Sequence, residues 1–483
     1  MKTKHKLLIT FLMLVAIGGN SCKKYLDINT NPLTATTVEP KLLFGYAITA
    51  WDANKNSGDS WIPIGLMVQN MASGGNFGWG AGDVYDMSPF SLNNTWNMYY
   101  NSGGNNLKLA IKAAEEADPK NNNTAAQCKI ILAQMMYEAT TLFGDIPYSE
   151  AFQAEKFPEP HFDPQKQVLE NIIVLLDEAI AQIDPASPLK ITDYDVFYGG
   201  DLTKWIKLAN SLKFKVLMVM VDKDPSKAAQ IGALLADPNN MISSPSDNQV
   251  FKHYTTTNQE NPKYRLFKKY TNGVNQWFFA NKNVFDYMAP LNDPRIPRYF
   301  DKGPNANDYI AVNTEQEADE TTALISAYLY RKDAPSVFLS YQEILLLQAE
   351  AYARGLGVNI DLAKSQQLFH DGVQAAMNFY EADPTEINTY LTTQLPDLTS
   401  VADPVKEIHI QQWIDLMDRP LDAFVQWRRS GTDGNEVPAL TLPAGAPAGP
   451  LIRRYTLAPV EKTSNSNIPT PLPLYYDKMW FDL

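Results

Sequence analysis

Apolar residues return at the spacing of an α-helix in several long stretches of this chain, and this pattern restricts the fold more than any other feature. Within each stretch, apolar side chains stand three or four positions apart, so they line one face of a helix. The stretches are 131–142, 168–179, 202–219, 344–352 and 362–376. The sequence therefore predicts a mainly α-helical protein built from antiparallel helix pairs.

Small residues gather in the fourth stretch, where two paired helices would approach closely. They include Ala349, Ala353 and Gly355. Helix pairs of this kind are typical of tetratricopeptide repeats, which have about 34 residues per pair. We therefore expect tetratricopeptide-like pairs, forming a right-handed superhelical half, over residues 38–235 and 336–430.

Two other regions show little helical periodicity and are rich in Pro, Asn, Gly and aromatic residues. They are residues 236–335 and 431–483. Their aromatic content is too high for disordered segments, and structureless loops of this length are uncommon unless they have a function. We expect 236–335 to form an irregular, loop-rich subdomain packed against the helices, and 431–483 to form an irregular C-terminal segment.

The N-terminus has the pattern of a secretory signal peptide. Lysines precede an apolar run at 7–17, and Gly19, Asn20 and Ser21 stand directly before Cys22. Such a segment is removed by cleavage. A cysteine at this point is typical of bacterial lipoproteins, although an ordinary signal with a chance cysteine remains the alternative. We expect residues 1–21 to be a signal peptide, Cys22 to carry the lipid, palmitate included, and residues 22–37 to be a lipidated tether.

Charge and cysteine content exclude several classes of protein. The chain has 41 basic and 54 acidic residues. Residues 1–21 contain lysines but no acidic residue, so their removal makes the chain more acidic. Nucleic acid and anionic membrane surfaces both require a basic face, so neither is an expected partner. Cys128 is the only cysteine besides Cys22, which excludes a disulfide scaffold. After the signal, no apolar run approaches the roughly 18 residues of a membrane-spanning helix.

Catalytic and metal-binding patterns are scarce. The sequence contains no HExxH, GxSxG or GxxxxGK[ST] motif. Its histidines lie far apart, at positions 5, 161, 253, 370 and 409. Asp193 and Asp195 resemble half of a calcium loop, but Phe197 and Tyr198 follow where further ligands are needed, so we expect a solvated turn. We predict no catalytic residues, metal or cofactor, although two suitably placed carboxylates would suffice for a glycosidase.

Five short motifs, in this order and spacing, together resemble the SusD/RagB-like family of surface lipoproteins, and particularly its divergent SusD-like branch. They are GDIPYSEA at 144–151, KWIKLANSLK at 204–213, DPRIPRYF at 293–300, the stretch 340–351, and QWI at 412–414 with QWRRSG at 426–431. The resemblance implies an outer-membrane lipoprotein, facing the cell exterior, that captures a nutrient oligomer without modifying it. It also implies a TonB-dependent, SusC-like transporter as the partner that imports the ligand.

Residues within these motifs suit structural roles. Trp205 shares a helical face with apolar neighbours, so we expect it to be a wedge in the core, with Asn210 and Ser211 bonding to nearby backbone groups. Gly144 stands where a helix C-terminus needs positive φ. Arg295 and Arg298 are expected to hold carboxylates or helix ends. The motifs therefore predict a scaffold rather than a binding site.

A glycine-rich loop at 73–86 is the main candidate for ligand binding. It carries the rings of Phe77, Trp79 and Tyr85 beside the polar Asn76 and Asp83. Flat rings pack on the C–H face of a sugar while amide and carboxylate groups bond its hydroxyls. The same loop suits an apolar peptide, and the alternative structural interpretation is that its rings cover the core as a plug. The family's ligand platform also consists of aromatic residues in irregular segments, but it cannot be aligned residue by residue to this loop.

A second aromatic cluster follows the turn dipeptide Asn272-Gly273. It contains Trp277 and Phe278, which we expect to form the opposite wall of the site or a small satellite core. Trp96 and Tyr100 stand four residues apart, and core packing is the better interpretation for both.

We expect the ligand to be an oligosaccharide, with a peptide as the alternative within the same transport system. Two other classes of function stay open. A repeat scaffold would contact proteins but bind no small ligand, and a glycoside hydrolase would release product.

Overall fold

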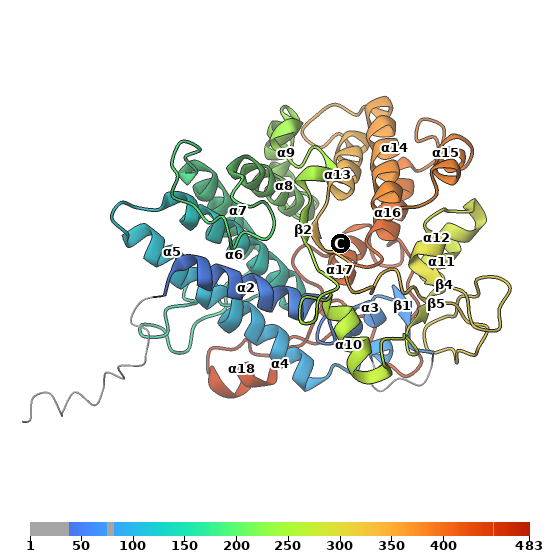
Figure 1. The fold of residues 1–483 in the computed structure, drawn as a ribbon, viewed down its shortest axis with the longest axis horizontal. Helices are drawn as coiled ribbons and strands as arrows, with labels where there is room; N and C mark the ends of the chain where they lie inside the picture. Colours follow the sequence, from blue (N-terminus) through green and yellow to red (C-terminus); the bar gives the residue numbers. More distant parts are fainter. Residues whose placement is uncertain (1–37, 75–81, 448) are drawn as a thin grey trace, which may run out of the picture. The chain divides into compact units, whose positions relative to one another are not determined.

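Helices dominate the computed structural model, which describes residues 38–74, 82–447 and 449–483. In the first half of the chain they pack in sequence order: α5 against α6, α6 against α7, and α7 against α8 (Figure 1). The N-terminal helix of this group, α2, packs across α5. The helices are α2 (Pro40–Lys55), α3 (Trp61–Met67), α4 (Pro89–Asn97), the π-helical η2 (Met98–Asn105), α5 (Asn106–Glu116), α6 (Asn122–Phe143), α7 (Gln165–Gln182), α8 (Leu202–Met220) and α9 (Ala228–Leu235).

A second group of helices follows later in the chain, where α13 packs against α14 and α16. These helices are α13 (Tyr341–Arg354), α14 (Leu362–Phe379), α15 (Pro384–Thr393), α16 (Pro404–Asp415), α17 (Pro420–Arg429) and α18 (Pro459–Ser464). Side chains cap several of them; Asp361, for example, accepts a hydrogen bond from the Lys364 amide at the start of α14. Every stretch with helical periodicity lies in a helix, so the predicted mainly α fold is confirmed.

Residues 236–335 contain more regular structure than the sequence indicates. Their elements are β2 (Gln249–Phe251), α10 (Pro262–Thr271), β3 (Phe279–Ala280), α11 (Lys282–Met288), α12 (Ile296–Tyr299), β4 (Phe300–Asp301) and β5 (Leu324–Ile325). A four-stranded sheet has the order β1-β3-β5-β4, in which β1 (Met71–Ala72) comes from the first half of the chain. A two-stranded ladder joins β2 to β6 (Ser336–Leu339). These strands are two to four residues long, which is too short for a periodic pattern to show in the sequence.

The core confirms the structural roles predicted for the motif at 204–213. Trp205 is fully buried, and its indole Nε1 donates to the Asp195 carboxylate at 2.7 Å. Asn210 donates to the carbonyl oxygen of Asn240 at 3.0 Å, and the Ser211 hydroxyl accepts from the Ile242 amide at 2.7 Å. The motif therefore ties α8 to the chain that follows α9.

The other motif residues also have structural partners. Gly144 ends α6 with φ +84°, as predicted. Arg295 is fully buried and donates through Nε to the Asp293 carboxylate at 2.9 Å, while the half-buried Arg298 donates to the Glu381 carbonyl oxygen. Both arginines therefore have the roles that the sequence predicts.

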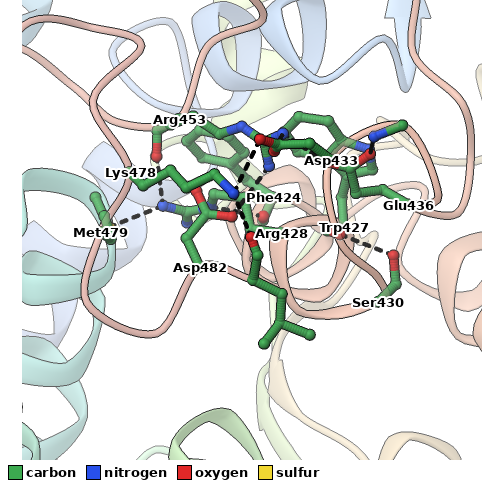
Figure 2. A network of polar contacts seen from close by, with 12 residues as sticks. Phe424, Trp427, Arg428, Ser430, Asp433, Glu436, Arg453, Lys478, Met479 and Asp482 are labelled. Carbon is green, nitrogen blue, oxygen red and sulfur yellow. Dashed lines mark hydrogen bonds and ion pairs between the residues drawn. The ribbon is translucent and has the colours of Figure 1, made fainter. Parts of the chain in front are cut away.

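The C-terminal segment is joined to α17 by a buried polar network (Figure 2). Arg428 lies over the ring of Phe424 and donates through Nη1 to the Arg453 carbonyl oxygen at 2.8 Å. Arg453 in turn donates to Asp482 at 3.0 Å and to Asp433 at 2.6 Å. Although residues 431–483 contain only the short α18 among the helices described, these contacts fix them to the helical scaffold.

Residues 40–483 form one compact unit. Its main hydrophobic cluster extends from Phe44 in α2 to Phe481 near the C-terminus, and a second cluster lies among α13, α14, α15 and α16. Within the described residues, no helix has the length and apolar content needed to cross a membrane.

Candidate ligand-binding site

The pairing of β1 with β3 brings the two predicted aromatic segments to one edge of the sheet. The strands are antiparallel, with Met71 opposite Ala280 and Ala72 opposite Phe279. The chain leaving β1 is the glycine-rich loop, and the chain entering β3 carries Trp277 and Phe278. Two segments about 200 residues apart in the sequence are therefore neighbours in the fold.

Gly74 allows the chain after β1 to lie close to Phe279 in β3. Its φ is +69°, and a Cβ atom at this position would lie 2.7 Å from the ring of Phe279 and 2.8 Å from Ala318. A larger residue would therefore be strained in both its backbone and its contacts. Three predicted ligand contacts, Asn76, Phe77 and Trp79, follow directly and lie outside the described residues.

The far end of the loop is buried, which corrects the prediction that Asp83 and Tyr85 are exposed. Asp83 is 5% exposed, and its carboxylate accepts a hydrogen bond from the Ser73 hydroxyl. Burial raises the pKa of this carboxyl group. Tyr85 is 3% exposed and packs against Tyr475, with ring centroids 5.7 Å apart. Both side chains hold the base of the loop, because η1 (Gly82–Val84) packs against α3.

Phe278 is also a core residue rather than a ligand contact. It is fully buried, and its ring meets those of Trp61 and Phe267 edge-on at centroid distances of 5.9 and 6.0 Å. The satellite-core interpretation is therefore the right one for this residue.

Trp277 is half-buried, and its nearest described aromatic neighbour is Tyr270 at the end of α10. The two ring centroids are 6.2 Å apart, and Tyr270 is 46% exposed. Asn275 fixes this turn, since its Oδ1 atom accepts from the backbone amides of Trp277 and Phe278, both at 3.0 Å. We call Tyr270 and Trp277 the aromatic pair.

Tyr270 is the site residue that the sequence analysis misses. It stands just before Asn272, whose left-handed conformation (φ +57°) ends α10 and reverses the chain. The sequence does contain a signal for this pair, because Tyr270 and Trp277 stand on the two sides of the Asn272-Gly273 turn. Asn272 and Gln276, both exposed, lie between the two rings in the sequence and add amide groups to this surface.

A family model described as "Starch-binding associating with outer membrane", SusD-like, matches residues 32–455. The match spans both the helical scaffold and the sheet edge. The chain belongs to this SusD-like family. The family description assigns its members starch binding and association with the outer membrane.

Solved structures have the same fold as this SusD-like protein. A chitin-binding protein is 21% identical with a TM-score of 0.76, and the alignment covers 92% of this chain and 100% of the other. A SusD/RagB family protein from Bacteroides thetaiotaomicron is 21% identical with a TM-score of 0.78, covering 92% and 99%. A SusD homologue from Parabacteroides distasonis is 19% identical with a TM-score of 0.76, covering 92% and 98%. No curated protein matches the sequence.

The acidic turn near α8 is structural in this SusD-like chain. Asp195 is 5% exposed, so the predicted solvated turn is wrong at this residue. Its carboxylate accepts from the Trp205 indole and from the amides of Tyr198 and Gly200, at 2.7, 3.0 and 2.8 Å. Across the part of the chain that the structure describes, no group of three or more His, Cys, Asp and Glu side chains is arranged to hold a metal ion.

Proposed function

We propose that this protein is a lipid-anchored protein of the outer membrane that binds a nutrient oligosaccharide and delivers it to a TonB-dependent, SusC-like transporter. The observation that carries the proposal is the aromatic pair. It lies where the chain enters β3, the strand that pairs with β1, in a SusD-like chain. Two rings with amide groups nearby suit the apolar face and the hydroxyl groups of a sugar.

The comparisons support a saccharide rather than another oligomer. The family description names starch, and one solved structure of the same fold is a chitin-binding protein. A peptide is the second candidate, because rings that stack on sugars also cover apolar side chains. A pure scaffold protein and a glycoside hydrolase are the remaining alternatives from other classes.

Titration calorimetry of the mature chain carrying Cys22→Ala tests the ligand class. The panel contains maltooligosaccharides, chitooligosaccharides and unrelated peptides, and chromatography of the same mixtures detects any product. We expect saccharide binding with no product. Binding of peptides alone would favour the second candidate, the absence of any small-molecule binding would favour a scaffold, and product release would overturn the non-enzymatic proposal.

The membrane anchor has its own test in cells. Cys22 supplies the thiol that would be acylated, so Cys22→Ala should remove labelling by a fatty-acid analogue and release the protein from the membrane fraction. Cys128→Ala is the control, because that thiol is fully buried in α6. Continued labelling or sedimentation of the Cys22→Ala protein would contradict the anchor.

Purification of the tagged wild-type protein from detergent-solubilised membranes tests the partner. We expect a TonB-dependent barrel to copurify, and the intact protein should face the exterior, where added protease reaches it in whole cells. Purification without such a barrel would contradict the transport role.

A further inference from the structure

Positive charge is concentrated around α10, although the chain as a whole has a net charge of −13. Residues 251–275 contain five Lys and Arg residues and a single acidic residue, Glu260. One of the five, Lys263, is buried and pairs with Asp418 at 2.5 Å, so it serves the scaffold. The others remain at or near the surface.

Three of these cations share one face of the helix. Arg265, Lys268 and Lys269 are spaced three and four residues apart and are all exposed. Lys332, from the chain after β5, joins them from outside α10. We call Arg265, Lys268, Lys269 and Lys332 the basic face.

The basic face is interleaved with tyrosine rings. The ammonium groups of Lys268 and Lys332 lie 5.9 and 5.4 Å from the centroid of the Tyr264 ring. Lys269 lies 4.9 Å from the ring centroid of Tyr270, which belongs to the aromatic pair. The positive charges therefore reach the candidate ligand site itself.

These charges have few acidic partners. Lys268 is 3.7 Å from Glu260, whose carboxylate also accepts from the Asn258 amide. Among the described residues, Arg265, Lys269 and Lys332 have no ion pair. The Glu260 carboxylate attracts both Lys268 and Lys332, so two cations share one acidic partner, and a bound anion would further reduce the repulsion between them.

We infer that the oligosaccharide bound at the aromatic pair is acidic, and that its carboxylate or sulfate groups contact the basic face. The inference rests on the proposed function and narrows its substrate class. Sugar rings would stack on Tyr270 and Trp277, while the negative groups of successive sugar units would meet Lys269, Lys268 and Arg265 along α10. A neutral glucan would leave these charges unused.

A cleft at the other end of α10 gives the ligand room to extend. It has a volume of about 710 Å³, within the range of small-molecule sites, and Lys252, Tyr254 and Arg265 are among its lining residues. Four carboxylates also line it, namely those of Asp52, Asp193, Asp195 and Glu260. Three of them are already bonded: Asp195 to Trp205, Asp52 to the side chain of Asn56 at 3.0 Å, and Glu260 to the Asn258 amide. Arg265 therefore links the cleft to the basic face.

Calorimetry with four probes tests the inference: oligogalacturonides for carboxylate, chondroitin sulfate oligosaccharides for sulfate, maltooligosaccharides as neutral sugars, and oligoglutamate as an acidic peptide. The test variant changes Arg265, Lys268, Lys269 and Lys332 to Gln. A matched control changes four exposed lysines elsewhere to Gln, namely Lys112, Lys120, Lys364 and Lys406. Melting temperatures show whether both variants fold.

We expect one of the two acidic saccharides to bind best, and its affinity to fall as salt is raised. The test variant should weaken this binding by about tenfold or more, since several surface ion pairs are lost together, and the control should change it by less than about twofold. If the protein binds one of the two acidic saccharides more tightly, that saccharide shows whether the ligand carries carboxylate or sulfate groups.

The outcomes separate this inference from the proposed function. Tight binding of maltooligosaccharides that the test variant leaves unchanged would overturn the acidic ligand and leave the proposed function intact. Binding of oligoglutamate alone would overturn the saccharide and favour a peptide. Equal losses in the test and control variants would show that net charge matters rather than this face.

Discussion

Trp205 and Trp277 are both conspicuous in the sequence, but the fold places them in opposite surroundings. Trp205 lies in the helical core with no exposed surface and donates to a buried carboxylate. Trp277 is half-buried at the edge of a short sheet, beside the exposed ring of Tyr270. The first stabilises the scaffold, whereas the second forms part of a surface that a ligand can contact.

The difference lies in what specifies each position. Trp205 belongs to a helix of 19 residues, so neighbours three and four positions away already indicate that it faces the core. The position of Trp277 depends on the pairing of β3 with β1, two strands of two residues each. Local sequence therefore predicts the scaffold well and the site poorly.

Among these variants, Trp205→Ala is expected to cause the largest loss of stability. A small loss would contradict the contrast between Trp205 and Trp277. Removing this buried ring should lower the free energy of unfolding by about 3–5 kcal/mol, as for other large-to-small changes in a core. Chemical denaturation measures the loss. Ligand affinity, corrected for the folded fraction, should stay at the wild-type value, and a variant of normal stability with weakened binding would place Trp205 in the site.

Phe278→Ala sharpens the comparison between two consecutive residues that directly precede β3. Phe278 is fully buried next to the half-buried Trp277, so its truncation should lower the free energy of unfolding by about 3 kcal/mol. The same denaturation experiment on Trp277→Ala provides the contrast, with a much smaller loss. Similar losses for both variants would mean that the two rings are equally part of the core.

The pH dependence of stability tests the network that fixes the C-terminal segment. Burial raises the pKa of Asp482 to about 6, although Arg453 opposes this rise. The folded state therefore holds the proton more tightly than the unfolded state does. The stability of the wild type relative to Asp482→Asn should fall by about 2–3 kcal/mol as the pH rises from about 4 to about 6, and then level off. A difference that does not vary with pH would contradict a buried, proton-binding Asp482.

The sequence predicted the helices, the buried Trp205 and the roles of Gly144 and Arg295, because each depends on neighbours within a few turns of the chain. It left open whether Tyr85 and Phe278 belong to the site or to the core, and it expected Asp83 in an exposed loop. All three are buried, and the rings of Tyr85 and Phe278 pack against distant segments. The sequence analysis also missed Tyr270, because the Asn272-Gly273 turn can be recognised in the sequence, but the 6.2 Å separation of the Tyr270 and Trp277 rings follows only from the fold. The roles of Asn76, Phe77 and Trp79 stay predictions.

Titration of Trp277→Ala, measured together with its melting temperature, tests the central claim most directly. Trp277 should contribute contact area to the ligand and little to the core, so its loss should weaken saccharide binding by about 1–3 kcal/mol. Its melting temperature should stay close to that of the wild type. A Trp277→Ala protein that melts many degrees lower, or that binds the saccharide as tightly as the wild type, would contradict the placement of the ligand at the aromatic pair.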